Sequence, residues 1–234
     1  MIAAVAAADP GVLTAPRVVA GGVPIRLTGR SFATGQAVRL ELRTRRGLKL
    51  LAVRRADRRG RVRFRFRPPR IRRRYRFRYE AGGTARTVTV RSRPVTLAAV
   101  GDVNLGDGPG AAMARRGFRY PWTSVAPVLG RADIAFANLE CAVSRRGHAV
   151  PKEFNFRGRR GALRIAHRFA GLDVLNLANN HTGDYGRTAL LDTVHYVRRF
   201  GMVAVGAGGS IRAARQAVRF RRAVIRDSRP VLAR

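Results

Sequence analysis

The chain has 234 residues, of which 46% are hydrophobic, so its length suits one large or two small globular domains and its composition excludes a disordered protein. The formal net charge at pH 7 is +35. Of the 48 basic residues only Lys49 and Lys152 are lysines, and all others are arginines. Nucleic-acid binders usually use both types, so this imbalance favours a bias towards GC-rich codons over a selected binding surface. Such a charge nevertheless attracts polyanions non-specifically at low salt.

Cys141 is the only cysteine, which excludes an intramolecular disulfide. No apolar stretch approaches the ~20 residues that span a bilayer. Residues 1–16 begin with MIAAVAAADP, whose alanines resemble the small-residue end of an export signal; the alternative is an ordinary frayed terminus. On the first interpretation the protein is secreted or held at the cell surface, and most of its export signal lies upstream of Met1.

Residues 17–93 alternate apolar and polar residues. In RVRFRFR and YRFRY the arginines fall on one face and the apolar residues on the other. The apolar positions are Val62, Phe64, Phe66, Tyr75, Phe77 and Tyr79. Turn signals recur about every ten residues, which predicts an antiparallel sandwich of six or seven half-buried strands. The pattern resembles the Ig-like modules that bacterial secreted proteins carry beside another domain.

The arginine rows of this segment have two interpretations. They could bind a polyanion, or they could form a solvated face that discourages pairing between sheet edges. The interleaved aromatic residues lie on the opposite, core face, so they offer no stacking platform for bases. We therefore expect a solvated face and no specific nucleic-acid partner, since no finger, recognition helix or RNA-binding signature is present.

Residues 95–234 have a different period, in which apolar runs alternate with helical stretches. The predicted strands are 95–100, 132–140, 172–181 and 201–208, and the predicted helices lie around 124–129, 162–170 and 188–200. This alternation predicts an α/β domain whose sheet is covered on both faces. In such sheets functional groups gather beyond the carboxyl ends of the strands.

Polar side chains follow three of these predicted strands. Asp102, Asn104 and Asp107 follow the first strand, Asn138 and Glu140 end the second, and Asn180, His181 and Asp184 follow the third. One sheet edge would bring the three groups together. Carboxylates, amide oxygens and a histidine are the ligands of a hard or borderline divalent metal. A pair of such ions activates water for phosphoryl displacement, with a nearby histidine as proton donor.

Four segments in this order carry a family resemblance: AAVGDVNLGD, ADIAFANLECAVS, FNFRG and GLDVLNLANNHTGDYG. Together they closely resemble the CapA-like domain associated with poly-γ-glutamate capsule synthesis, within the calcineurin-like metallophosphatase superfamily. The resemblance covers roughly residues 95–215. The expected fold is an N-terminal all-β Ig-like sandwich followed by an incomplete α/β domain of the metallophosphatase type.

The resemblance implies the metal ligands. Asp102 takes the place of the first-motif ligand, Glu140 that of the second motif, and Asn180 that of the ligand asparagine. Asn104 stands where many metallophosphatases have a metal-binding histidine, so the ion there would be weakly held or the site singly occupied. The implied cofactor is a divalent ion, namely Mn, Zn, Fe or Ca.

The same resemblance assigns the proton chemistry. His181 takes the place of the proton-donating histidine, and Asp184 would orient it as a hydrogen-bond acceptor. Local alternatives exist for the other polar residues: Asn179 would support a turn and Cys141 would be a small buried apolar residue. His148, His167 and His195 lie in loop or helical contexts and are not expected to bind metal.

The chain also departs from the family pattern after VGAG, where the family continues with further strands and an H-W-G-x-E-like motif. The stretch VRFRRAVIRDSRPVLAR shows neither, which predicts a C-terminally truncated domain with an incomplete metal site. Two functions remain. One is a CapA-like hydrolase-type protein whose partners are an anionic polymer such as poly-γ-glutamate, a phosphorylated cell-surface intermediate, and membrane-associated capsule assembly proteins. The other is a non-catalytic, arginine-rich polyanion-binding surface protein.

Overall fold

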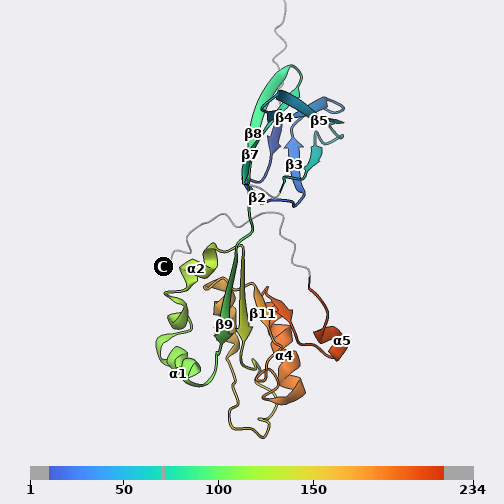
Figure 1. Cartoon of the computed structure of the whole chain (residues 1–234). Coiled ribbons are helices and arrows are strands. Elements are labelled where there is room, and N and C mark those ends of the chain that lie inside the picture. Colours follow the sequence, from blue (N-terminus) through green and yellow to red (C-terminus); the bar gives the residue numbers. More distant parts are fainter. Residues whose placement is uncertain (1–10, 70–71, 219–234) are drawn as a thin grey trace, which may run out of the picture. The chain divides into compact units, whose positions relative to one another are not determined.

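The computed structural model describes residues 11–69 and 72–218, which form two compact units, one ending at Val95 and the other starting at Thr96 (Figure 1). Residues 1–10 of the predicted export-signal remnant lie outside the described residues, as do residues 219–234 of the predicted irregular C-terminal stretch. Among the residues that are described, no helix is long and apolar enough to cross a membrane.

The first unit consists of strands in two sheets. Strands β1 (Val12–Thr14), β3 (Ile25–Arg30) and β6 (Val62–Phe66) form one sheet in the order β1-β3-β6. The other has the order β2-β8-β7-β4-β5, with β2 (Val18–Ala20), β4 (Ala37–Thr44), β5 (Gly47–Arg55), β7 (Arg73–Ala81) and β8 (Thr84–Arg93). All pairs are antiparallel except β2 with β8, which is parallel. The described part of this unit therefore has eight strands rather than six or seven.

Both sheets contribute to one hydrophobic core. Phe64 of β6 and Phe77 and Tyr79 of β7 are buried, whereas Arg63 and Arg65, which flank Phe64, are exposed. The predicted alternation along these strands is confirmed, because side chains on a pleated strand point to opposite faces in turn. The resemblance to an Ig-like module remains a prediction.

The second unit is an α/β structure built on a parallel sheet. Its strands are β9 (Leu97–Val103), β10 (Ile134–Leu139), β11 (Val174–Asn176) and β12 (Val203–Val205), in the order β12-β11-β10-β9. The helical segments are α1 (Asp107–Arg116), η1 (Tyr120–Trp122), α2 (Ala126–Arg131), α3 (Arg160–Arg168), α4 (Gly186–Arg199) and α5 (Ile211–Ala214). Three of the helices, α2 to α4, match the predicted ones. The sequence pattern does not predict α1, because two glycines and a proline in DGPGAAMARR lower helix propensity.

The sheet is not covered on both faces along its whole width, so this prediction is wrong for β9. Ala135 and Leu139 of β10 and Leu175 of β11 are fully buried, but Leu97 of β9 is 64% exposed and Val100 is 41% exposed. Within the described residues β9 pairs only with β10 and is the edge strand. The strand also runs to Val103, so that Asp102 lies inside it rather than after it.

Cys141 follows β10 and is completely buried in the core of the second unit. Burial disfavours the thiolate and raises the pKa of this thiol to about 12. The prediction of a small buried apolar residue is confirmed, because a thiol in such surroundings behaves as a small hydrophobe.

Candidate functional site

Three polar side chains lie in one row across the carboxyl ends of the sheet. Asn138 of β10 is in register with Asp102 of β9 on one side and with Asn176 of β11 on the other. The register of β9 against β10 shifts between Phe136 and Asn138, and this irregularity brings Asp102 level with Asn138. The positions of these three side chains are therefore set by strands and not by a loop.

The side-chain amide of Asn138 connects the row. Its Nδ2 donates to Asp102 Oδ1 at 2.8 Å and also to Glu140 Oε2. Its Oδ1 accepts hydrogen bonds from Asn176 Nδ2 at 2.9 Å and Asn179 Nδ2 at 3.0 Å. Because two amide donors fix the oxygen end, the NH₂ end faces the two carboxylates. Asp102 and Glu140, two of the predicted metal ligands, thus share Asn138 Nδ2 as a hydrogen-bond donor.

Asn179 holds the turn that follows β11. Its Oδ1 accepts from the backbone N–H of His181 at 3.0 Å and of Thr182 at 2.9 Å, while its Nδ2 also donates to the Leu139 carbonyl at 2.9 Å. This confirms the turn-supporting role expected of Asn179. The turn leaves the predicted ligand Asn180 exposed and His181 half-buried.

The predicted pair of His181 and Asp184 is in direct contact. His181 Nδ1 lies 2.8 Å from Asp184 Oδ2, and the imidazole stacks on the Phe156 ring with a centroid distance of 4.1 Å. A carboxylate at Nδ1 selects the tautomer that carries its proton there, and it leaves Nε2 open. The stacked ring fixes the plane of the imidazole.

Asp184 is fully buried and is held by more than the histidine. Lys152 Nζ lies 2.5 Å from its Oδ1, and the Phe156 N–H donates to its Oδ2 at 2.6 Å. Burial alone would raise the pKa of Asp184. The Lys152 ammonium, the Phe156 N–H and His181 outweigh burial and leave that pKa below its ordinary value. Asp184 is therefore a stable anion in the site.

Asn104 and Asp107 are placed differently from the other predicted residues. Asn104 Oδ1 accepts the Gly106 N–H at 2.8 Å, which is a turn-forming contact. Asp107 is exposed and begins α1 with a φ of 46°. In the described part of the chain, neither side chain is hydrogen-bonded to Asn138, His181 or Asp184.

No group of three or more His, Cys, Asp and Glu side chains within residues 11–69 and 72–218 is close enough to hold a metal ion. The site instead contains two smaller sets. One joins Asp102 and Glu140 through Asn138, and the other joins His181, Asp184 and Lys152. Asp102 and Glu140 offer neighbouring carboxylate oxygens, which are the donors that a single oxygen-preferring cation takes. The set is too small for a pair of ions.

Sequence reasoning missed Lys152, Phe156 and Asn176. A signal existed for Lys152, which is one of only two lysines in a chain rich in arginine and therefore stands against the coding bias. Phe156 belongs to the segment FNFRG, but nothing in that segment indicated a contact with His181. Asn176 could not be found, because its partner Asn138 is set by the register of β10 and β11.

The second unit matches a known protein family. Residues 96–226, more than half of the chain, match the family described as Bacterial capsule synthesis protein PGA_cap. The chain belongs to this family. The Capsule biosynthesis protein CapA of Bacillus anthracis is 30% identical over 118 residues, which are 49% of this chain and 28% of that protein. This CapA-like chain therefore spans less than a third of that relative's length.

Solved structures give only distant likenesses. The carbohydrate acetylesterase XAC1771 from Xanthomonas citri is 14% identical, with 83% of this chain and 60% of that chain covered and a TM-score of 0.31. PhoD is 10% identical, with 83% and 37% covered and a TM-score of 0.28. A human fibronectin type-III domain is 16% identical, with 39% and 94% covered and a TM-score of 0.27. Scores this low carry no argument about fold or function.

Proposed function

We propose that this CapA-like protein carries a hydrolase-type site that depends on one divalent cation, held by Asp102, Glu140 and Asn180. The observation that carries the proposal is the convergence of Asp102 and Glu140 on the NH₂ group of Asn138. Two neighbouring carboxylates repel each other unless positive charge lies between them. A cation of the Mn, Zn, Fe or Ca type would supply that charge and would polarise a phosphoryl or carbonyl oxygen when bound.

The exposed amide of Asn180 would complete the protein ligands, and water the remaining positions. Asn104 is the weakest member of the predicted set, since its amide oxygen already accepts the Gly106 N–H. A single ion is therefore proposed rather than a pair.

The proton chemistry is proposed for His181. In the imidazolium form Nδ1–H would donate to Asp184, and Nε2–H would give its proton to a leaving group, which leaves the neutral imidazole with its remaining proton on Nδ1. Lys152 balances the charge of Asp184, so that the carboxylate orients the imidazole without taking its proton. The role of Asp184 is that of a positioning residue.

The proposed substrate class is an anionic polymer such as poly-γ-glutamate, or a phosphorylated cell-surface intermediate. Support comes from the family and from a relative named as a capsule biosynthesis protein. A secreted or surface location, an Ig-like character of the first unit and contacts with membrane-associated capsule assembly proteins belong to the same proposal.

Metal binding tests the proposal directly. Calorimetric titration of the parent with Mn²⁺, Zn²⁺ and Ca²⁺ should give about one ion per chain for one of these metals. Asp102→Asn/Glu140→Gln should weaken that binding by at least about tenfold, because both charged ligands are lost. Asp107→Asn removes an exposed carboxylate of the same unit and should bind as the parent does. Equally negligible binding by all three proteins would refute the cation site.

A second candidate is polyanion binding without catalysis, which the exposed arginine rows such as Arg63 and Arg65 favour. The two candidates respond to different agents. Binding through counterion release falls steeply with salt and ignores chelators, whereas hydrolysis at a cation site is abolished by chelators.

A further inference from the structure

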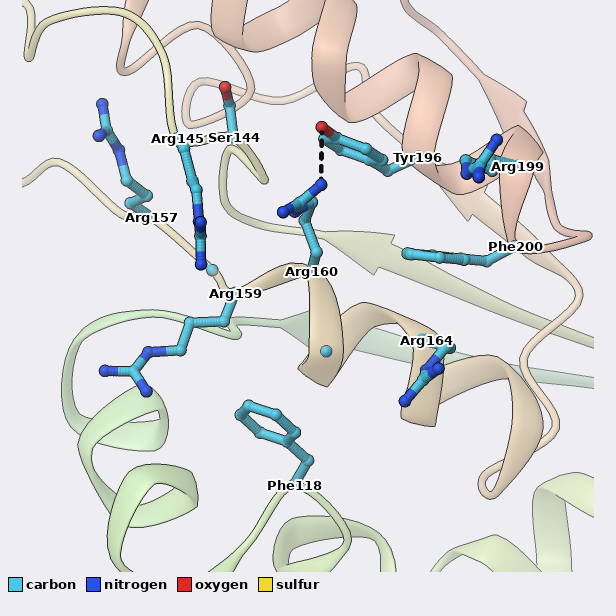
Figure 2. Close-up of a pocket in the computed structure, with 12 residues that line it drawn as sticks. Phe118, Ser144, Arg145, Arg157, Arg159, Arg160, Arg164, Tyr196, Arg199 and Phe200 are labelled. Carbon is cyan, nitrogen blue, oxygen red and sulfur yellow. Dashed lines mark hydrogen bonds between the residues drawn. The ribbon is translucent and has the colours of Figure 1, made fainter.

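The second unit contains a cavity of about 950 Å³ that the candidate cation site does not use (Figure 2). It lies between the start of α3, the C-terminal end of α4 and the segment that follows β10. Half of its 12 lining residues are arginines: Arg145, Arg157, Arg159, Arg160, Arg164 and Arg199. Among the residues that the structure describes, no carboxylate lines the cavity.

The arginines of this cavity have no ion-pair partner within the described residues. Arg157 Nη2 donates to the Gly147 carbonyl at 2.9 Å, and its guanidinium lies 3.5 Å from the centre of the Tyr185 ring. Arg160 donates to the Tyr196 hydroxyl at 3.3 Å. These contacts orient the guanidinium groups but cancel none of their charge. Like charges gathered in a concave site attract counter-ions strongly.

The start of α3 adds to the positive potential. Arg159 precedes the helix with extended backbone, no side chain caps the free N–H groups, and the first turn holds no acidic residue. Gly161 of that first turn lines the cavity. A helix begins with unpaired N–H groups and the positive end of its dipole, so this end favours an anion.

We propose that this cavity binds a segment of a chain that bears several carboxylates. Its volume is typical of sites that enclose a ligand of many atoms, far larger than one small anion. Guanidinium groups match carboxylates in two-point hydrogen bonds, and the exposed ones of this cavity can engage several carboxylates in succession. In this respect the inference rests on the proposed function, because it says where an anionic polymer is held.

The aromatic side chains of the cavity favour such a chain over a nucleic acid. Arg160 lies 5.1 Å from the centre of the Tyr196 ring, and Tyr196 stacks against Phe200 with a centroid distance of 6.2 Å. Phe118 packs so closely on Gly161 that a Cβ there would lie 2.5 Å from its ring. Single-stranded nucleic acids bind by stacking bases on free rings, and these rings are already engaged.

The cavity adjoins the candidate site along the chain. Phe156 stacks on His181, and the next residue, Arg157, lines the cavity. Binding of the acidic chain nevertheless requires neither a cation nor hydrolysis.

The test measures the affinity for a fluorescein-labelled octaglutamate by fluorescence polarisation, in 0.15 M NaCl with EDTA. The variant Arg145→Ala/Arg164→Ala/Arg199→Ala changes only exposed rim side chains and should raise the Kd at least about tenfold. The control Arg43→Ala/Arg74→Ala/Arg76→Ala removes the same charge from a second arginine-lined cavity, which lies in the first unit and has no helix. It should change the Kd by less than about twofold.

Equal losses in the two triple variants would overturn the proposal, because they would show binding by net charge alone. An absence of binding by the parent would overturn it too, as would tighter cavity-dependent binding of octathymidylate. The presence of EDTA separates this result from the cation site. Acidic-peptide binding without any metal binding would contradict the proposed hydrolase function and would support the proposed role of the cavity.

Discussion

Lys152 contacts three different groups of the candidate site. Its ammonium contacts Asp184 Oδ1, lies 3.3 Å from His181 Nδ1 and donates to the Asn180 carbonyl at 3.0 Å. One side chain thus touches the proposed proton donor, its positioning carboxylate and the backbone of the proposed ligand asparagine. A compact ammonium can make these contacts at once, whereas a planar guanidinium has a different donor geometry.

Replacing Lys152 therefore has a predictable effect on stability. Lys152→Met leaves the buried Asp184 without its cation, and the free energy of unfolding at pH 7 should fall by about 2 kcal/mol. Urea unfolding followed by the fluorescence of Trp122 measures this change. The matched control is Arg115→Met, which removes an exposed cation of the same unit and should stay within about 0.5 kcal/mol of the parent. Equal effects of the two changes would show that the contact of Lys152 with the buried Asp184 contributes nothing specific to stability.

The residues of the site differ in how far the sequence predicts them. The contact of His181 with Asp184 spans three residues and the turn role of Asn179 is local, so short-range patterns contain both. The meeting of Asp102 with Asn138 depends on how two strands distant in the chain align. Nothing within either segment encodes that alignment, and only the paired sheet supplies it.

At the scale of elements, helix α4 is tied to the segment that follows β10. Asp192 of α4 accepts a hydrogen bond from Ser144 Oγ at 2.6 Å and one from Arg146 Nε at 3.0 Å. The Arg146 guanidinium and the Ser144 hydroxyl outweigh burial, which alone would raise the pKa of Asp192, and they lower that pKa to about 2. The same segment provides Ser144 and Arg145 to the arginine-lined cavity, so this tie shapes one of its walls.

The hydrogen bonds of Asp192 should make the stability of the second unit depend on pH in the acid range. Because the folded pKa of Asp192 lies below its ordinary value of 3.8, its stabilising effect is complete above pH 3.8 and is lost as the pH falls to about 2. Asp192→Asn should be less stable than the parent at pH 7, and the difference should shrink between pH 3.8 and 2. Urea midpoints from Trp122 fluorescence at several pH values would reveal this.

The control for this acid response is Glu153→Gln, which alters an exposed carboxylate without a hydrogen bond in the described part of the chain. Its difference from the parent should be small at every pH. A constant difference between Asp192→Asn and the parent down to pH 2 would contradict the ion pair.

Elements were predictable where their own period was strong. The alternation of β6 and β7 and the apolar run of β10 follow from side-chain geometry along a strand. The exposure of β9 was not predictable, because its run of apolar residues is the same whether or not another strand or helix covers it. Local pattern specifies the element, whereas its neighbours decide its burial.

At the scale of the whole molecule, the two units have separate hydrophobic cores. One core contains Phe77 and the other residues of the β sheets, and the other contains Trp122 and residues of the α/β unit. Trp122 is the only tryptophan of the chain and is buried. Its fluorescence therefore reports on the second unit alone.

Because the cores are separate, a mutation in one core should lower the stability of its own unit and leave that of the other unit unchanged. Phe77→Ala empties the centre of the first core and should reduce the stability of that unit by about 4 kcal/mol. Far-UV circular dichroism should show the loss, while the urea midpoint of Trp122 fluorescence should not move. Leu175→Ala in the second core is the reciprocal change and should shift the Trp122 midpoint. A shift of that midpoint by Phe77→Ala would show that the two units unfold together.

The burial of Cys141 has a practical consequence for labelling. A thiol with a pKa of about 12 and no solvent exposure is almost entirely protonated at neutral pH and inaccessible to alkylating reagents. The native protein thus behaves as if it had no cysteine at all. A cysteine introduced on the rim of the arginine-lined cavity would be the one reactive thiol, so a dye or spin label could be attached there without first removing Cys141 from the core.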